Sequence, residues 1–238
     1  MYHAEDVHWW YRGMEVITRA LLNRWLPENS QLRILDAGCG TGGAMTGFLA
    51  DYGQVTGVDL YPQALAFCRR RHAERIACAS VLDLPLESAS FDVVTCFDVL
   101  YERGVIHELK ALQEFSRVLS SNGWLFLRLP AYDWLRGQHD EQVHTHRRYT
   151  KGLVRELLET SGFVVEHLTY ANTILFPLAV LKRLTEKFLP AQDIKSDLTF
   201  NTSAYDLILR RLLASEAFWA SRIGLPYGLS VMAVARKQ

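Results

Sequence analysis

The sequence has no excess of charge of either sign, because 26 lysines and arginines are balanced by 26 aspartates and glutamates. A strongly basic surface would attract nucleic acid, and this composition provides no such overall field. The sequence also lacks a long apolar run. The longest, 174–181, contains Pro177 and is far shorter than the roughly 20 residues of a membrane span. We therefore expect no nucleic-acid partner and no transmembrane span.

Cysteine is scarce, and its arrangement carries no metal-binding or disulfide pattern. The four cysteines form no C-x-x-C pair and lie in or beside apolar segments: Cys39, Cys68, Cys78 and Cys96. Free thiols of this kind are typical of a reducing compartment. The first six residues also lack the apolar core of a signal peptide. We expect a cytoplasmic protein without a bound metal.

The most informative stretch is 34–43, which reads ILDAGCGTGG. Its pattern predicts a buried parallel strand, an acid (Asp36) and a glycine-rich turn that opens a helix. Glycines allow a tight turn and a close approach of a ligand to backbone N–H groups. Because Gly38, Gly40 and Gly43 also fit G-x-G-x-x-G, the spacing alone leaves a dinucleotide open as the ligand.

Strands alternate with helices through residue 130, which predicts a parallel sheet with helices on both faces. Four acids follow or close successive strand segments: Asp36, Asp59, Asp83 and Asp98. Parallel sheets bind ligands beyond the carboxyl ends of their strands, so we expect these acids at one ligand-binding edge. Four carboxylates there favour a ligand that is rich in hydrogen-bond donors and carries positive charge.

The N-terminal region, 1–30, is expected to form a cap. Residues 8–12 (HWWYR) precede an amphipathic helix that ends before Pro27. The aromatic residues and Arg12 have two compatible interpretations. They lie over a ligand, or the helix packs on the sheet edge.

Residues 130–149 form a loop with an unusual density of reactive side chains. Candidate acid–base residues are His139, His144, His146 and Tyr149. A metal site is an alternative for the histidines, but no recognised zinc pattern is present. A plain surface loop is another.

A helix over 151–160 and a strand over 163–170 follow, and 228–236 alternates like a final strand. Between them, 171–226 is expected to be a helical insertion, with helices over 176–189 and 204–220, that covers the site as a lid. Two alternatives for its apolar face are a partner subunit in a homodimer and contact with a membrane surface. The whole chain, 1–238, is expected to form one domain.

A nicotinamide dehydrogenase is the natural competitor, but the chain has no Tyr-x-x-x-Lys pair. Asp36 before the glycine turn would repel a nucleotide phosphate and attract an ammonium or a sulfonium group.

The motifs as a set resemble those of class I S-adenosylmethionine-dependent methyltransferases. The similar segments are LDAGCGTG (35–42), VD (58–59), DLPL (83–86), FDVV with DVL (91–94 and 98–100), and RVL with NG (117–119 and 122–123). A looser similarity links 8–12 and 139–149 to bacterial methyltransferases of small-molecule or glycan pathways (methyltransferase type 11/12-like). The resemblance implies a Rossmann-like three-layer α/β sandwich. Its seven-stranded sheet would have the order 3-2-1-4-5-7-6, with the last strand antiparallel and the helical insertion before it.

The resemblance also implies residue roles. Asp36 and the glycine turn would face the methionine part of the cofactor, Asp59 the ribose and Asp83 the adenine amino group. The expected cofactor-binding set is Tyr11, Arg12, Asp36, Gly38, Cys39, Gly40, Thr41, Asp59, Leu60, Asp83, Leu84, Asp98 and Val99. The expected acceptor-binding set is Trp10, Tyr101, Tyr132, Arg147 and Arg148. Many relatives have Glu-His where this chain has Tyr101-Glu102, so no histidine base is expected there.

The expected function is metal-independent transfer of a methyl group from S-adenosylmethionine, leaving S-adenosylhomocysteine, to an O or N atom of a small molecule. One of His139, His144 and His146 would act as base, because histidine titrates near neutrality. A catalytically silent cofactor-binding protein is an alternative. A nucleic-acid methyltransferase is a weaker one, since DVLY (98–101) replaces the (Asn/Asp)-Pro-Pro-(Tyr/Phe) stretch.

Overall fold

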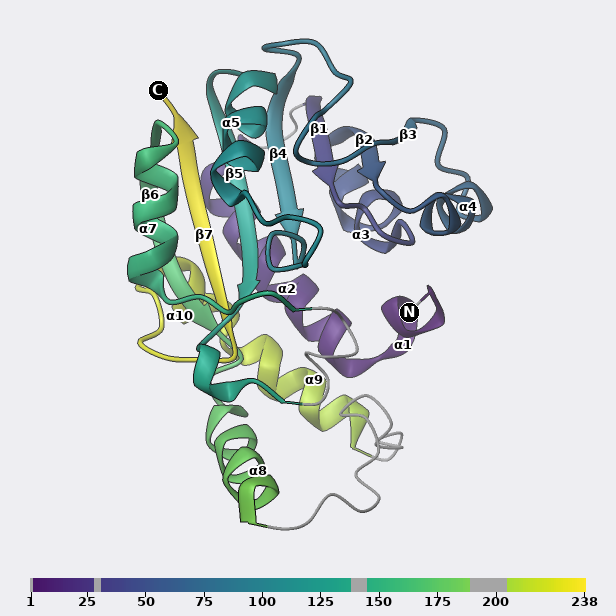
Figure 1. Ribbon diagram of the computed structural model, residues 1–238. Coiled ribbons are helices and arrows are strands. Elements are labelled where there is room, and N and C mark those ends of the chain that lie inside the picture. The colour runs from purple at the N-terminus through teal and green to yellow at the C-terminus, as the bar shows by residue number, and fades with distance from the viewer. Residues whose placement is uncertain (1, 28–30, 138–144, 189–204) are drawn as a thin grey trace.

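The computed structural model describes residues 2–27, 31–137, 145–188 and 205–238 (Figure 1). Its centre is one seven-stranded sheet with the order β3-β2-β1-β4-β5-β7-β6. The strands are β1 (Leu32–Ala37), β2 (Gly53–Asp59), β3 (Ile76–Cys78), β4 (Phe91–Phe97), β5 (Leu119–Pro130), β6 (Phe163–Ala171) and β7 (Ser230–Lys237). Strand β7 runs antiparallel to both neighbours, and the other pairings are parallel. The predicted sheet order and antiparallel last strand are confirmed.

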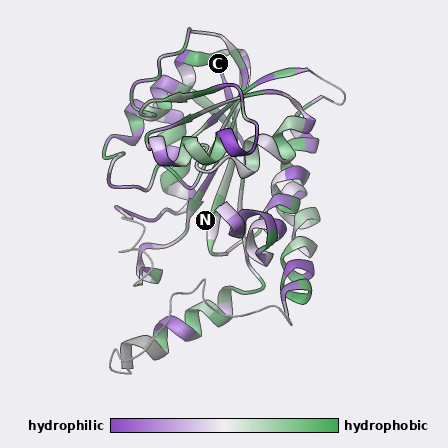
Figure 2. Cartoon of the chain, turned by 90° about the vertical axis from the view of Figure 1, so that its right-hand side faces the viewer, coloured by the Kyte–Doolittle hydropathy of each residue, from purple (hydrophilic) through white to green (hydrophobic). Residues whose placement is uncertain are grey.

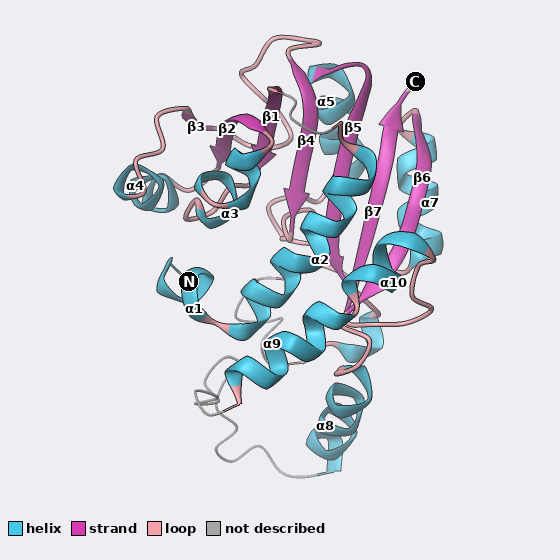
Figure 3. Cartoon of the chain, turned by 180° about the vertical axis from the view of Figure 1, so that it is seen from behind, coloured by secondary structure: helices cyan, strands magenta, loops and turns pink. Residues whose placement is uncertain are grey.

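Helices cover both faces of the sheet (Figures 1 and 3). They are α1 (Tyr2–Val7), α2 (Trp9–Trp25), α3 (Gly43–Thr46), α4 (Pro62–Arg70), α5 (Glu108–Val118), α7 (Lys151–Thr160), α8 (Phe176–Phe188), α9 (Asp206–Ser215) and α10 (Ala217–Arg222). Two 3₁₀ turns, Phe48–Asp51 and Asp133–Leu135, complete the set.

The two faces of the sheet build two separate cores, because successive side chains of a strand point to opposite sides. Leu35 and Val94 pack with α5 and α7, whereas Ile34 and Val93 pack with α2. The middle positions of these two strands, 34–35 in β1 and 93–94 in β4, are apolar and buried, as expected of parallel strands that are covered on both faces. The arrangement leaves the carboxyl ends of β1, β2 and β4 at one edge, where three of the four predicted acids lie: Asp36, Asp59 and Asp98.

The N-terminal segment differs from the expectation that residues 8–12 precede the helix. His8 is the N-cap of α2, and its Nδ1 accepts a hydrogen bond from the backbone N–H of Trp10 at 3.2 Å. Trp10, Tyr11 and Arg12 therefore belong to the first turns of α2. Satisfying a free N–H at a helix start is what lets the helix begin this early.

The insertion over 171–226 also differs in detail. The helix predicted over 204–220 is divided into α9 and α10 at Glu216, a buried residue whose carboxylate accepts from the backbone N–H of Ile174 at 2.7 Å. Helices α9 and α10 contact α2 on one face of the sheet, while α8 projects beyond the strand ends (Figure 1). No helix of the described ranges has both the length and the hydropathy of a membrane-crossing segment.

Candidate active site

The glycine turn after β1 is fixed by the neighbouring strand. The backbone N–H groups of Gly38 and Cys39 both donate to the carbonyl of Val58, at 2.7 and 3.0 Å. Gly38 has φ +83, and a Cβ there would lie 2.2 Å from the Cγ2 of Val99. Only glycine fits this position, both in backbone conformation and in space. The turn is thereby held against the residue that follows β4.

Asp36 lies immediately before this turn and is almost completely buried, with 3% of its surface exposed. Its Oδ1 accepts a hydrogen bond from the hydroxyl of Thr95 at 2.9 Å. Burial nevertheless raises the pKa of Asp36 to about 7, since a carboxylate loses its hydration there. A cation bound beside Asp36 would favour the ionised form and lower that pKa.

Asp59, at the end of β2, holds two backbone segments together. Its Oδ2 accepts from the N–H of Gly40 at 2.8 Å, and its Oδ1 accepts from the N–H of Tyr61 at 2.9 Å. Each carboxylate oxygen can accept a second hydrogen bond. Asp59 can therefore bind two hydroxyl groups of a ligand without releasing the turn.

Helix α1 is fastened over the glycine turn by charged side chains. Glu5 accepts from the N–H of Gly43, the first residue of α3, at 3.0 Å. Arg71 donates to Asp6 at 2.7 Å and to the carbonyl of Thr41 at 3.1 Å. Helix α1 thus forms one wall of the site.

A second wall is organised by a residue that the sequence analysis missed, Arg128. It lies near the end of β5, and its Nε donates to Oδ2 of Asp98 at 2.7 Å. The guanidinium lies over the rings of Trp10 and Phe97, 5.1 Å from each ring centroid. Arg128 therefore joins α2, β4 and β5 at the strand edge. The only signal for it in the sequence was an arginine inside an otherwise apolar strand pattern.

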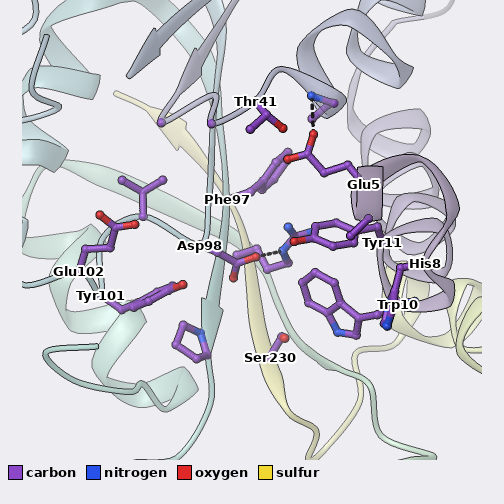
Figure 4. A pocket seen from close by; sticks show the side chains of 18 of the residues that line it. Glu5, His8, Trp10, Tyr11, Thr41, Phe97, Asp98, Tyr101, Glu102 and Ser230 are labelled. Atoms are coloured by element: carbon purple, nitrogen blue, oxygen red, sulfur yellow. Dashed lines mark hydrogen bonds and ion pairs between the residues drawn. The ribbon is translucent and has the colours of Figure 1, made fainter. Parts of the chain in front are cut away.

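These walls enclose a cavity of about 1910 Å³. Figure 4 shows Tyr101 and Glu102 reaching into it opposite Tyr11 and Trp10. Burial, reinforced by the charge of Asp59, raises the pKa of Glu102 above its ordinary value. The predicted residues that line the cavity are Trp10, Tyr11, Arg12, Asp36, Gly38, Cys39, Gly40, Thr41, Asp59, Leu60, Asp98, Val99, Tyr101 and Arg148.

Comparison with known proteins agrees with this geometry. Residues 35–127 match the family model of a methyltransferase domain. The chain is 35% identical over 150 residues to a malonyl-[acyl-carrier protein] O-methyltransferase of Enterobacter lignolyticus, and 32% identical over 167 residues to a ubiquinone biosynthesis O-methyltransferase of Idiomarina loihiensis. These matches cover 60% and 61% of this chain, and 57% and 66% of the relatives. The chain thus spans under two thirds of either relative. A solved S-adenosylmethionine-dependent methyltransferase from Mesorhizobium loti shares the fold, with a TM-score of 0.60 at 19% identity over 91% of this chain and 95% of that one.

Residues 35–127 thus form a methyltransferase domain of the class I S-adenosylmethionine-dependent type. Its cofactor is S-adenosylmethionine, which supplies an activated methyl group on a sulfonium. The residues at the site fit this molecule. The carboxylate of Asp36 has lost its hydration by burial, so a cationic group beside it would be stabilising. The carboxylate oxygens of Asp59 can each accept a further hydrogen bond from a hydroxyl group. Gly38 has no side chain, so a ligand can approach the backbone of the turn.

Two residues of the expected cofactor-binding set, Asp83 and Leu84, do not line the cavity. Asp83 is exposed, and the side chain of Leu84 is buried in the core on the α5 face of the sheet. The chain turns away from the edge here, because the N–H of Asp83 donates to the carbonyl of Ser80 at 3.1 Å. Residues 79–81 line the cavity instead.

Several residues expected to bind the acceptor or act in catalysis are engaged in the fold of the methyltransferase. Tyr149 is buried, and its hydroxyl group is the donor to two acceptors, the Leu100 carbonyl oxygen and Oε1 of Glu108, each 3.0 Å from the hydroxyl oxygen. Arg147 forms an ion pair with Glu108 at 3.1 Å. Tyr132 stacks on Tyr170 with centroids 5.1 Å apart. None of Tyr132, Arg147 and Tyr149 lines the cavity.

Of the three candidate histidines in the predicted loop, the structure describes only His146. His146 is exposed and does not line the cavity, although its backbone N–H donates to the carbonyl of Tyr101. His139 and His144 lie outside the described residues. Within the ranges that the structure describes, no three His, Cys, Asp or Glu side chains gather closely enough to hold a metal ion.

Proposed function

We propose that this methyltransferase transfers the methyl group to a hydroxyl oxygen of a small-molecule acceptor without a metal ion. The observation that carries the proposal is that one cavity is lined both by the cofactor-binding turn and by Tyr101, Glu102 and Trp10. An acceptor held among those three side chains would face the cofactor end of the same space. Alignment alone supplies a large part of such a rate enhancement, roughly 7–11 kcal/mol.

Glu102 is the proposed base. Its side chain lines the cavity, and its raised pKa brings a carboxylate closer to neutrality, where general bases are most effective. The proton of the acceptor hydroxyl would move to Glu102 as the acceptor oxygen takes the methyl group, and the bond from the methyl carbon to the sulfonium sulfur would break to leave S-adenosylhomocysteine. This assignment replaces the histidine base that the sequence suggested.

Oxygen is favoured over nitrogen by the relatives, both of which are O-methyltransferases by name. A hydroxyl is favoured over a carboxylate because a hydroxyl must lose a proton, which Glu102 in the cavity could accept, whereas a carboxylate is already ionised near neutrality. The charge of the lining does not decide between the two acceptors, since its acids are accompanied by arginines such as Arg103, Arg128 and Arg148.

The test is release of S-adenosylhomocysteine from S-adenosylmethionine in the presence of matched alcohol, phenol, carboxylic acid and amine acceptors. The proposal predicts turnover with hydroxyl acceptors. Turnover confined to amines or to nucleic acid would contradict it. Cofactor binding without turnover of any acceptor would favour the silent binding protein instead.

A further inference from the structure

The cavity continues well beyond the cofactor-binding edge. Its volume of about 1910 Å³ exceeds the roughly 300–1,000 Å³ of a typical small-molecule site. One end is lined by the glycine turn, 38–41. The other is lined by Leu175, just before α8, by Leu178, Ala179, Leu181, Lys182 and Arg183 of α8, and by Leu135 and Leu209. A cofactor and a compact acceptor would leave the α8 end unfilled.

The α8 end presents leucine side chains to open space. Leu178 and Leu181 are 64% and 58% exposed, and both line the cavity together with Leu175. Leu175 immediately precedes α8, and its carbonyl accepts a hydrogen bond from the N–H of Ala179 at 3.1 Å, so Leu175 and Leu178 are neighbours on the first turn of the helix. Figure 2 shows apolar and hydrophilic residues mixed along the helices that extend below the sheet. Exposed leucines gathered along one cavity indicate an apolar ligand.

Charge is distributed unevenly along the same cavity. Among the described residues that line it, the acids belong to α1, α2, the strand edge and the segment after β4, and none belongs to α8. The charged lining residues of α8 are Lys182 and Arg183, and the Nε of Arg183 donates to the Leu135 carbonyl at 3.1 Å. The cavity is thus polar where methyl transfer is proposed and rich in leucine at the far end. A ligand complementary to both ends is amphipathic.

We propose that the acceptor carries a long hydrocarbon chain, acyl or isoprenoid in type, that lies along Leu175, Leu178 and Leu181 while its hydroxyl lies beside Tyr101 and Glu102. The proposal rests on the proposed function. The leucines line the same cavity as the cofactor turn, so we assign the hydrocarbon chain to the acceptor itself. Contact with a membrane or a second subunit would not require the leucines and the cofactor turn to share one cavity.

The experiment measures binding of 1-alkanols with six, eight, ten and twelve carbons to the full chain saturated with S-adenosylhomocysteine. Calorimetric titration below the aggregation limit of each alkanol gives the affinity. The proposal predicts an affinity that rises about fourfold for each added CH₂ that is buried. An affinity that does not depend on chain length, or no binding, would overturn it.

Matched variants locate the binding. Leu178→Gln should weaken the twelve-carbon alkanol about tenfold and reduce the dependence on chain length. Leu184→Gln should leave both unchanged, because Leu184 is 49% exposed on the same helix and does not line the cavity. Equal weakening by both variants, or by neither, would overturn the proposal. Failure of S-adenosylhomocysteine itself to bind would instead count against the proposed function.

Discussion

Arg128 and Asp98 are joined twice at the edge of the sheet. The N–H of Asp98 donates to the Arg128 carbonyl at 2.8 Å, and Nε of Arg128 returns a hydrogen bond to Oδ2 of Asp98 at 2.7 Å. Asp98 adopts φ +58, which is uncommon for a residue with a side chain. Such local strain persists where the surroundings impose it, and it concentrates at functional sites. Here the pair sets the position of Trp10 against the strand edge.

This pair should matter more than a surface pair of the same type. Asp98→Asn removes the partner of a cation that is 11% exposed, and should lower the free energy of unfolding by about 1–3 kcal/mol. Asp92→Asn is the control, because its partner Arg33 is 49% exposed and surface pairs contribute less than about 1 kcal/mol. Urea unfolding measures both. Equal losses would show that Asp98 and Arg128 have no special structural role.

The raised pKa of Asp36 predicts how cofactor affinity depends on pH. Below pH 7 Asp36 is largely protonated in the free protein, and a cationic cofactor favours its ionised form. Affinity for S-adenosylmethionine should therefore rise from pH 5.5 to about pH 7, with release of a proton at the lower pH. Calorimetry in two buffers of different ionisation enthalpy measures both. The Asp36→Asn variant should lose this pH dependence, and its persistence there would contradict the assignment.

The same carboxyl group should affect the stability of the cofactor-free protein. Its pKa is raised on folding, so the folded state holds a proton that the unfolded state has already lost between about pH 4 and pH 7. The contribution of Asp36 to stability therefore falls as pH rises through that window, by at most about 4 kcal/mol at 1.36 kcal/mol per pKa unit. Asp36→Asn should flatten this decline in urea unfolding. An identical decline in the wild type and the variant would contradict the shift.

Glu102 offers a kinetic test of the proposed base. Glu102→Gln should lower kcat for a hydroxyl acceptor by about 10²–10⁴ and leave cofactor affinity unchanged. In the wild type, the rate should rise with pH as Glu102 ionises, above the usual range of a glutamate because its pKa is raised. That rise should be absent from the variant. Glu159→Gln is the control, since Glu159 pairs with Arg155 on an exposed part of α7. A wild-type rate in Glu102→Gln would exclude this role.

The sheet could be predicted from the sequence because its information is local. Apolar runs alternate with helical patterns, and Asp36 and Asp59 stand directly at the ends of their strands. Parallel strands place their carboxyl ends at the same edge of the sheet, so the position of Asp36 and Asp59 could be predicted, and both residues line the cavity. The prediction for Asp83 was wrong because β3 ends at Cys78, and the four residues between Cys78 and Asp83 allow the chain to turn away from the edge.

The rest of the site depends on contacts between segments that are distant in the sequence. Arg128 meets its partner Asp98 from another strand, and Tyr149 is drawn into the core by Leu100 and Glu108. A tyrosine or an arginine in a polar loop looks equally suited to a ligand or to a buried carboxylate. The choice between them is made by tertiary packing, which no local pattern contains.

The most direct test of the account is titration of S-adenosylmethionine into the wild type, Asp59→Ala and Asp83→Ala. The wild type should bind one cofactor per chain. Asp59→Ala should bind about ten- to a hundredfold more weakly, because it loses charged hydrogen bonds at the cavity. Asp83→Ala should bind like the wild type, since Asp83 is exposed and does not line the cavity. Unchanged affinity in Asp59→Ala, or an equal loss in Asp83→Ala, would contradict the site described above.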